Sequence, residues 1–371
     1  MWRGRRSSGE NGRVKTLRLK AFTGEVNANN HETPDFAAAL DEAARILRAG
    51  GLVAFPTETV YGLGANALDA GAVERIFAAK GRPKWDPIIV HVSSLEMARE
   101  LVSNIPDSAA RLIEAFWPGP LTLLLPRSAA VPDVVTAGRP LVGIRMPSHP
   151  VALELIRRAG VPIAAPSANR FSHVSPTTAE HVLHDLDGRI DAVLDAGPTL
   201  HGVESTVLDP NQKPMVIYRP GAITAEMIRD IAGSAENYAT SAELKETPAQ
   251  ALPSPGVGLR HYAPRARLIL IESGGTGAEI ASRITHAALT NECDRVGIML
   301  PAGIPLPEEL FALPIFNWGR WDAPDEMAQS LYAGLRALDE QNCTVILCPL
   351  PPHEGIGVAI RDRLGKARTR K

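Results

Sequence analysis

Hydrophobic side chains recur at helical spacing between residues 34 and 50, behind a start signal formed by Thr33, Pro34 and Asp35. Proline suits the first position of a helix and an acidic residue its first turn, so we predict an amphipathic helix that ends at Gly50. Continuous apolar runs predict buried strands at 52–57 and 87–92, and helical spacing predicts a second helix over 70–81.

The middle of the chain mixes helices with many short strands. Helical spacing predicts two further helices, and short apolar runs bounded by turn residues predict six further strands. The helices cover 95–102 and 109–116, and the strands cover 121–126, 141–147, 161–167, 192–197, 205–209 and 215–221. Because helices and strands do not alternate regularly, we expect an open α/β fold, with a twisted mixed sheet covered by helices, and not a doubly wound one.

Periodicity stops near residue 232, and the segment up to 266 is rich in Pro, Gly and small residues, which predicts a linker. Strands and helices alternate after it, as in a small Rossmann-like domain. The glycine-rich turn at 272–279 has the spacing of neither a dinucleotide fingerprint nor a P-loop, and we interpret it as a plain turn. We therefore predict a disordered basic tail at 1–30, a larger domain at 31–231, a linker or lid at 232–266 and a small α/β domain at 267–371.

Charge is distributed unevenly along the 371 residues. The formal net charge is −2, but residues 1–20 carry seven Lys/Arg and one Glu, and residues 361–371 carry six Lys/Arg and one Asp. Basic ends on an acidic body fit either a weak contact with RNA or another polyanion, or simply solvated termini. No apolar signal or membrane-length segment is present, and three cysteines without a CxxC pair favour a reducing cytoplasm. The Arg- and Ser-rich start leaves a mitochondrial targeting segment as an alternative.

Three cations lie close together in the stretch "KGRPK". Gly81 and Pro83 constrain the chain around Lys80 and Arg82, and fixed cations of this kind suit a polyphosphate, with Arg able to bind two oxygens at once. The alternative is a helix C-terminus whose cations interact with the helix dipole.

Polar side chains follow several predicted strands. Ser167, Asn169 and Ser175 come after the buried run at 161–165, where strand ends commonly form ligand crevices, although Ser175 before Pro176 also has the pattern of a helix cap. Arg145 lies inside an apolar strand and requires an anionic partner, from the protein or from a ligand. Further polar groups near strand ends are Thr57, Glu58, Thr59, Tyr61, Glu204, Ser205, Thr206 and Arg219.

The histidines give weaker signals. His181 and His184 have the i, i+3 spacing of a metal pair, but no HExxH pattern occurs and surface or capping roles are favoured over metal binding. His91, within "IIVHV", is either a core histidine or a wall of a site. No nucleophile elbow appears, so the inventory favours positioning and electrostatic catalysis on a nucleotide over a covalent hydrolase.

Seven motifs in order resemble the YrdC-like family of L-threonylcarbamoyladenylate synthases, in its long form with an extra C-terminal domain. These are "FPTETVYGLGANA", "KGRP" with "PIIVHV", "WPGPLTLLLP", "VGIRMPSHP", "APSAN", "GVESTVLD" and "YRPGAI". The resemblance implies a nucleotidyltransferase that converts L-threonine, bicarbonate or CO2, and ATP into threonylcarbamoyl-AMP and pyrophosphate. A separate transferase complex would then pass the threonylcarbamoyl group to tRNA.

The resemblance also implies residue roles. Lys80 and Arg82 would act on the ATP phosphates as catalytic residues, Arg145 would bind the threonine carboxylate, and Mg²⁺ would accompany the nucleotide. The linker would close over the pocket as a lid, with Tyr262 near the ligand. The implied ATP site is Lys80, Arg82, Asp86, Leu141, Ser167, Asn169, Ser175, Arg219 and Tyr262, and the implied threonine site is Thr59, His91, Arg145, Ala165, Ser205 and Thr206. Asp86 departs from the family, which usually has Asn there, and this puts its contact with ATP in doubt.

Two alternatives belong to other functional classes. An RNA-binding module would use the basic surface, but aromatic residues are only 5% of the chain and none lies among the basic motif as a stacking platform. A carbamoyl-transferring relative of the hydrogenase maturation proteins would need Cys-rich zinc motifs, which this sequence lacks.

Overall fold

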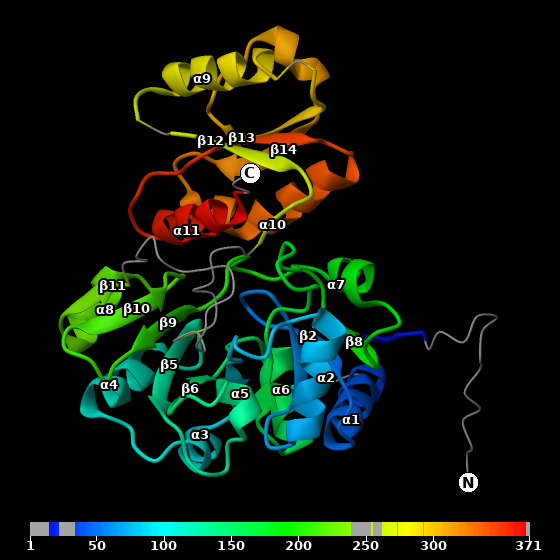
Figure 1. The fold of residues 1–371 in the computed structure, drawn as a ribbon, viewed down its shortest axis with the longest axis vertical. Helices are drawn as coiled ribbons and strands as arrows, with labels where there is room; N and C mark the ends of the chain where they lie inside the picture. The colour runs from blue at the N-terminus through cyan, green and yellow to red at the C-terminus, as the bar shows by residue number, and fades with distance from the viewer. Residues whose placement is uncertain are drawn as a thin grey trace.

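The computed structural model of the 371-residue chain describes residues 15–21, 34–238, 254, 262–272, 274–291 and 293–368. Within them the strands form one sheet of eleven and one of four (Figure 1). The larger sheet has the order β1-β8-β2-β3-β7-β4-β6-β5-β9-β10-β11. Its strands are β1 Leu17–Lys20, β2 Val53–Pro56, β3 Tyr61–Asn66, β4 Val90–His91, β5 Leu121–Pro126, β6 Leu141–Arg145, β7 Ile163–Ala164, β8 Ala192–Asp195, β9 Thr206–Asp209, β10 Met215–Arg219 and β11 Ala235–Asn237.

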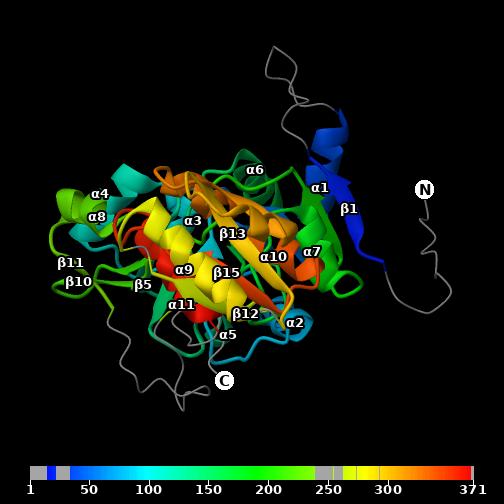
Figure 2. The same cartoon turned by 90° about the horizontal axis from the view of Figure 1, so that it is seen from above.

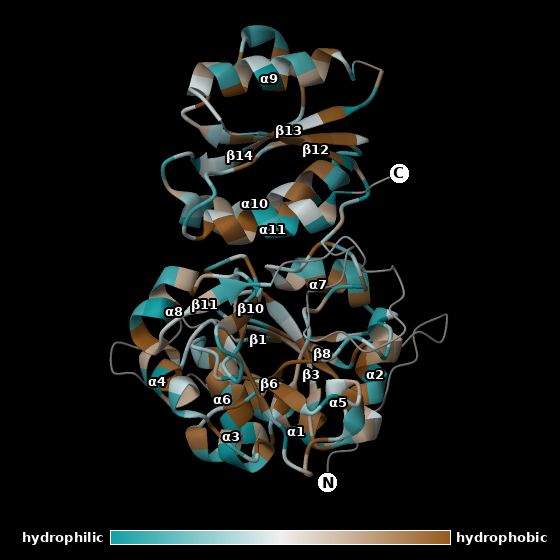
Figure 3. Ribbon diagram, turned by 60° about the vertical axis from the view of Figure 1, so that its left-hand side comes forward, coloured by the Kyte–Doolittle hydropathy of each residue, from teal (hydrophilic) through white to brown (hydrophobic). Residues whose placement is uncertain are grey.

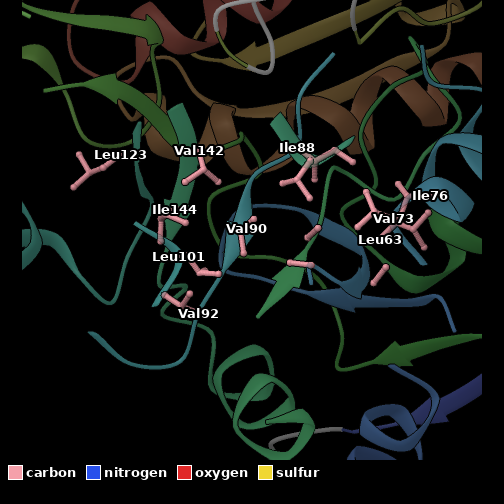
Figure 4. Packing of buried hydrophobic residues seen from close by; sticks show 14 of the residues in the cluster. Leu63, Val73, Ile76, Ile88, Val90, Val92, Leu101, Leu123, Val142 and Ile144 are labelled. Carbon is pink, nitrogen blue, oxygen red and sulfur yellow. The ribbon is translucent and has the colours of Figure 1, made fainter. Parts of the chain in front are cut away.

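Helices cover both faces of the larger sheet. Alternate residues of β2 show this directly, because Val53 and Phe55 pack against α1 and α6 whereas Ala54 belongs to the core on the opposite face. Figure 4 shows that second core, in which Leu63, Ile76 and Val90 lie among other aliphatic side chains. The helices are α1 Pro34–Arg48, α2 Ala70–Lys80, α3 Leu95–Leu101, α4 Asp107–Phe116, α5 Asp133–Thr136, α6 Pro150–Ala159, α7 Ala179–Leu186 and α8 Ala225–Ala232.

Parallel and antiparallel pairs both occur in this sheet. Strand β2 pairs antiparallel with β3 and parallel with β8, and β5 pairs antiparallel with β6 and parallel with β9. The prediction of a mixed α/β sheet is therefore confirmed. The strand predicted over 87–92 shortens to β4, because only Val90 and His91 keep ladder pairs with β6 and β7.

Two segments predicted to lack regular structure contain strands. Residues 17–20, assigned to the disordered tail, form β1, which lies near α1 and α7 (Figure 2). This strand pairs parallel with β8 at the end of the sheet. Arg18 Nη2 lies 2.6 Å from Asp195 Oδ2, so this ion pair joins β1 to β8 at the edge of the sheet. Residues 235–237, assigned to the linker, form β11 beside β10. The rest of the predicted lid, 239–253 and 255–261, lies outside the described residues, as do residues 1–14 of the tail.

The smaller sheet is entirely parallel, in the order β12-β15-β13-β14, as predicted for a Rossmann-like unit. Helix α9 covers one face, and α10 and α11 cover the face that is turned toward the larger unit (Figure 1). Figure 3 shows the hydrophobic colour gathered on β12 and β13 between these helical layers. The elements are β12 Arg267–Ile271, α9 Gly277–Leu289, β13 Val296–Ala302, a 3₁₀ turn Glu308–Ala312, β14 Ile315–Arg320, α10 Pro324–Glu340, β15 Val345–Pro349 and α11 Gly357–Ala367.

The two units share a hydrophobic core. Val60, Val174 and Val203 of the larger unit belong to the same buried cluster as residues of α10 and α11. Gly202, at φ +68°, brings its backbone so close to α10 that a Cβ atom would lie 2.3 Å from the Ala328 carbonyl oxygen. The smaller unit is thus packed directly on the loops that precede β9. In the described part of the chain, no helix has the length and apolar character needed to cross a bilayer.

Candidate active site

A pocket lies where the loops after β2, α2 and β7 meet strands β3, β4, β6 and β10 and the segments before β9 and β12. Three guanidinium groups and one carboxylate supply the charges of its lining, so the pocket is suited to anionic ligands. Its walls are formed by Thr57, Thr59, Val60, Gly62, Arg82, Pro87, Ile88, Ile89, His91, Arg145, Ala165, Pro166, Ser167, Glu204, Ser205, Arg219 and Tyr262.

Arg82 reaches the pocket from the turn after α2. Gly81 ends that helix at φ +66°, as the sequence predicts for a tight exit. The Arg82 guanidinium is held from behind, because its Nη2 lies 2.9 Å from Asp86 Oδ1 and also donates to the Pro87 carbonyl oxygen at 2.7 Å. Burial raises the pKa of Asp86, and the Arg82 charge opposes that rise. Asp86 therefore fixes an arginine and is not itself part of the pocket wall.

Lys80 is buried beneath the pocket and not in its wall. Its ammonium donates to the backbone carbonyl oxygens of Ser167 and Asn169, which joins the end of α2 to the loop after β7. Burial, together with the charge of Arg82, lowers the pKa of Lys80 well below its ordinary value. The structure thus gives Lys80 a role in shaping the loop that carries Ser167.

Ser175 does not cap a helix. Helix α7 begins at Ala179, and the Thr178 side chain accepts the bond from the His181 backbone N–H. Ser175 is fully buried and its hydroxyl donates to Glu204 Oε1 at 2.6 Å, so the capping alternative is wrong. The order "SPTT" places two further hydroxyl groups closer to the helix, and the last of them, on Thr178, forms the cap.

Arg145 extends from β6 into the other end of the pocket. Its Nη2 lies 2.7 Å from Glu58 Oε1, its Nη1 donates to Thr59 Oγ1 at 3.0 Å, and its Nε donates to the Gly119 carbonyl oxygen. Burial acts to raise the pKa of Glu58, but the Arg145 guanidinium outweighs it and lowers that pKa. The predicted anionic partner of Arg145 is therefore supplied by the protein itself.

His91 forms part of the same wall. Its ring meets Phe55 edge-on at a centroid distance of 6.2 Å. Burial and the nearby Arg145 charge lower the pKa of His91 to about 3, so the imidazole is neutral at physiological pH. Of the two alternatives left by the sequence, the wall of the site is the one the structure supports.

Arg219 organises the strand ends at the back of the pocket. Its Nε donates to the Ser205 carbonyl oxygen at 2.9 Å and its Nη2 to Ser205 Oγ at 3.0 Å. Thr206 instead donates its hydroxyl to the Ile223 carbonyl oxygen at 2.7 Å, so Ser205 is the one that faces the pocket. Leu141 packs with the apolar cluster around Ile89 behind the wall.

The pocket brings together nine of the predicted site residues and leaves six behind its surface. The nine are Thr59, Arg82, His91, Arg145, Ala165, Ser167, Ser205, Arg219 and Tyr262, and the six are Lys80, Asp86, Leu141, Asn169, Ser175 and Thr206. Glu204 was noted from sequence as a polar group near a strand end but not as a site residue. Its side chain lines the pocket, and two of its partners, Tyr332 and Arg363, lie more than a hundred positions later, which local pattern does not reveal.

A metal site is not evident among the residues that the structure describes. No group of three or more His, Cys, Asp or Glu side chains has the geometry to hold an ion. The carboxylates at the pocket, Glu58, Asp86 and Glu204, are each held by an arginine. His181 Nδ1 faces Thr177 and His184 Nδ1 lies 2.9 Å from Asp185, so the two histidines do not converge on one ion.

Comparisons with known proteins cover nearly the whole chain. A family model described as "Telomere recombination" matches residues 45–221, and one described as "Threonylcarbamoyl-AMP synthase, C-terminal domain" matches 223–368. Threonylcarbamoyl-AMP synthases of Pyrococcus abyssi and Bacillus subtilis are 43% and 44% identical to this chain, over 88% of it and 92% of each relative. The crystal structure of P. abyssi Sua5 complexed with L-threonine has a TM-score of 0.83 and 38% identity, covering 95% of this chain and 97% of that one.

Proposed function

This chain belongs to the threonylcarbamoyl-AMP synthase family, and from that premise we propose that its pocket joins L-threonine, bicarbonate and ATP to give threonylcarbamoyl-AMP and pyrophosphate. The observation that carries the proposal is the charge of the pocket wall. Three buried arginines, Arg82, Arg145 and Arg219, face one cavity together with neutral hydroxyl and imidazole groups. An amino-acid carboxylate and a polyphosphate are the anions that such a wall would bind.

The threonine end is assigned to Arg145, Thr59 and His91. A P. abyssi relative has been solved with L-threonine bound, and the corresponding role here is a binding site for that amino acid. Because Glu58 neutralises part of the Arg145 charge, the threonine carboxylate would compete with Glu58 for the guanidinium, and the displaced carboxylate is then placed to accept from the amine. A neutral His91 adds no charge that would repel the substrate ammonium.

The nucleotide end is assigned to Arg82, Arg219 and Ser167, with Lys80 shaping the loop behind them. In the reaction, the threonine ammonium first releases a proton to solvent, and the free amine then combines with bicarbonate to form a carbamate and water. A carbamate oxygen then attacks the α-phosphorus of ATP, and pyrophosphate leaves with the electrons of the broken P–O bond. The protein's contribution is to hold the two anions in line and to stabilise charge on the departing pyrophosphate.

Mg²⁺ is expected with ATP from the family resemblance. The described carboxylates at the pocket are bound to arginines, so they do not fit a dedicated magnesium cage. We assign no step to the ion, and a magnesium requirement would come from the ATP phosphates themselves.

The reaction's wider setting follows from its product. Threonylcarbamoyl-AMP is a mixed anhydride that a transferase would consume in order to modify tRNA. The three cysteines form no disulfide in the described chain, which supports the proposal of a reducing cytoplasm as the setting. A direct RNA-binding role is less well supported, because the guanidinium groups of the pocket are buried and out of reach of a duplex backbone.

The test is a substrate-omission experiment. The purified full-length protein is incubated with ATP, L-threonine and bicarbonate, and pyrophosphate is measured with a coupled assay. We expect release to require all three substrates. Release that is independent of threonine, or its complete absence when all three are present, would rule out the proposed reaction.

A further inference from the structure

Glu204 is the one acidic side chain in the wall of the pocket as the described residues define it. A carboxylate at this position is unfavourable for a site that takes a triphosphate, because like charges at short range in a buried environment repel strongly. The proposed reaction therefore needs a means of neutralising Glu204 while ATP is bound.

The smaller unit supplies that means. Arg363 Nε of α11 donates to Glu204 Oε2 at 2.8 Å, and the Tyr332 hydroxyl of α10 contacts Oε2 at 2.9 Å and Oε1 at 3.1 Å. Both side chains are fully buried, and Ser175 donates to the same carboxylate. Burial acts to raise the pKa of Glu204, but Arg363 and Arg219 outweigh it and lower that pKa to about 2, so the group is ionised and its charge is compensated.

The same two residues hold an aromatic part of the pocket wall. The Tyr262 ring stacks on Tyr332 with centroids 5.7 Å apart, and the Arg363 Cζ atom lies 5.4 Å from the centroid of the Tyr262 ring. Tyr262 also has φ +64°, a conformation that is costly for a tyrosine and that the surrounding packing must maintain. Arg363 and Tyr332 thus compensate the charge of Glu204 and hold the Tyr262 ring in place, although neither residue lines the pocket.

We propose that Arg363 and Tyr332 are positioning residues for the nucleotide: they mask the Glu204 charge and hold Tyr262 in place, so that the smaller unit completes the ATP end of the pocket. This inference rests on the function proposed above. It predicts that substitution of either residue weakens the binding of ATP more than the binding of threonine. If the ion pair between the two units had only a structural role, its loss would instead lower stability and weaken the binding of both substrates alike.

The experiment compares KM values for ATP and for threonine across four variants. Arg363→Met removes the guanidinium, and Asp362, its other partner, keeps Lys366 at 2.8 Å. Tyr332→Phe keeps the ring stack but removes the hydroxyl. Arg361→Met is the matched control on the same helix, because Arg361 pairs with exposed Glu272 and the Pro351 carbonyl oxygen, neither of which belongs to the pocket wall.

We expect Arg363→Met to raise the KM for ATP by at least about tenfold, because truncating one partner leaves a buried charge uncompensated, and to change the KM for threonine by no more than about twofold. Tyr332→Phe should give a smaller rise, and Arg361→Met none. The decisive variant is Arg363→Met with Glu204→Gln: if masking is the role of Arg363, removing the charge restores the KM for ATP.

Equal effects on both substrates, or no restoration by Glu204→Gln, would overturn the inference. If Arg363→Met does not fold, as thermal denaturation would reveal, Tyr332→Phe and its combination with Glu204→Gln provide the same comparison. Wild-type protein that releases no pyrophosphate would instead defeat the proposed function. Direct titration with an α,β-methylene analogue of ATP would then still test the masking of Glu204.

Discussion

The buried pair between Arg82 and Asp86 gives a clear test at the scale of single residues. Arg82→Met would leave the Asp86 carboxylate buried without its principal partner, at a cost of about 3–5 kcal/mol in the free energy of unfolding, and would remove a cation from the pocket. The double variant with Asp86→Asn should recover most of that free energy in urea denaturation while turnover stays low.

The double variant separates binding from stability. If its turnover returned to the wild-type level together with its stability, the guanidinium would have only a structural role, and the assignment of Arg82 to the ATP phosphates would be wrong. The buried pair also explains why this chain has Asp86 where the family usually has Asn. The negative charge of the aspartate is compensated by the guanidinium of Arg82.

His91 predicts a dependence of stability on pH. The folded-state pKa is lowered to about 3 from an ordinary value of 6.5, so between these values the unfolded chain binds a proton that the folded chain does not. The contribution of His91 to the free energy of unfolding is fully present above pH 6.5. It falls as the pH is lowered, by about 2 kcal/mol at pH 5. Urea denaturation of His91→Asn should therefore show a shallower loss between pH 7 and pH 5 than the wild-type chain. Parallel slopes in the two proteins would contradict the buried neutral imidazole.

At the scale of elements, Lys80 joins α2 to the loop after β7. Lys80→Met keeps the length of the side chain but removes both bonds to the Ser167 and Asn169 carbonyl oxygens. We expect turnover to fall by at least about a hundredfold, because a small displacement of a site loop has effects of that size, while the melting temperature changes little.

Lys84 is the matched control for Lys80. It lies four residues later, is largely exposed, and pairs with exposed Glu74. Lys84→Met should retain wild-type turnover in the same pyrophosphate assay. Comparable losses of turnover in the two variants would show that turnover depends on the total charge of the basic stretch and not on the contacts of Lys80 with the loop after β7.

Local pattern predicted most strands of the larger sheet but missed β3 and the helices α5, α6 and α8. The sequence predicts no strand over residues 61–66, where "YGLGAN" forms strand β3. Its glycines fit a strand because a Cβ at Gly64 would lie 2.8 Å from Phe55 and Ile163, which no local signal encodes. The motif residues of the pocket were predictable because each lies in or beside a recognisable strand or helix end. The partners of Glu204 in the smaller unit were not, since sequence gives no reason to connect the segment before β9 with α10 and α11.

At the scale of the whole molecule, Gly202 sets how closely the two units pack. Gly202→Ala would place a Cβ 2.3 Å from the Ala328 carbonyl oxygen and 2.5 Å from Gln329 Cα, so α10 must shift. We expect a loss of about 1–3 kcal/mol in the free energy of unfolding beyond the strain of a left-handed alanine, together with a fall in turnover, because α10 carries Tyr332.

Gly197→Ala isolates the backbone strain. Gly197 has φ +83°, also in the left-handed region, but nothing lies within 4 Å of the position of its Cβ. Denaturation of both variants should show Gly202→Ala to be clearly the less stable. Equal losses would mean that the contact between the units contributes nothing beyond the conformation of one residue.

One pocket is proposed to build a carbamoyl link between threonine and AMP. The most direct measurement is mass spectrometry of the product formed in a sealed vessel from ATP, L-threonine and ¹³C-labelled bicarbonate. We predict threonylcarbamoyl-AMP that carries the label, in step with pyrophosphate release. An unlabelled threonyl-AMP, or AMP without any labelled adduct, would contradict the account.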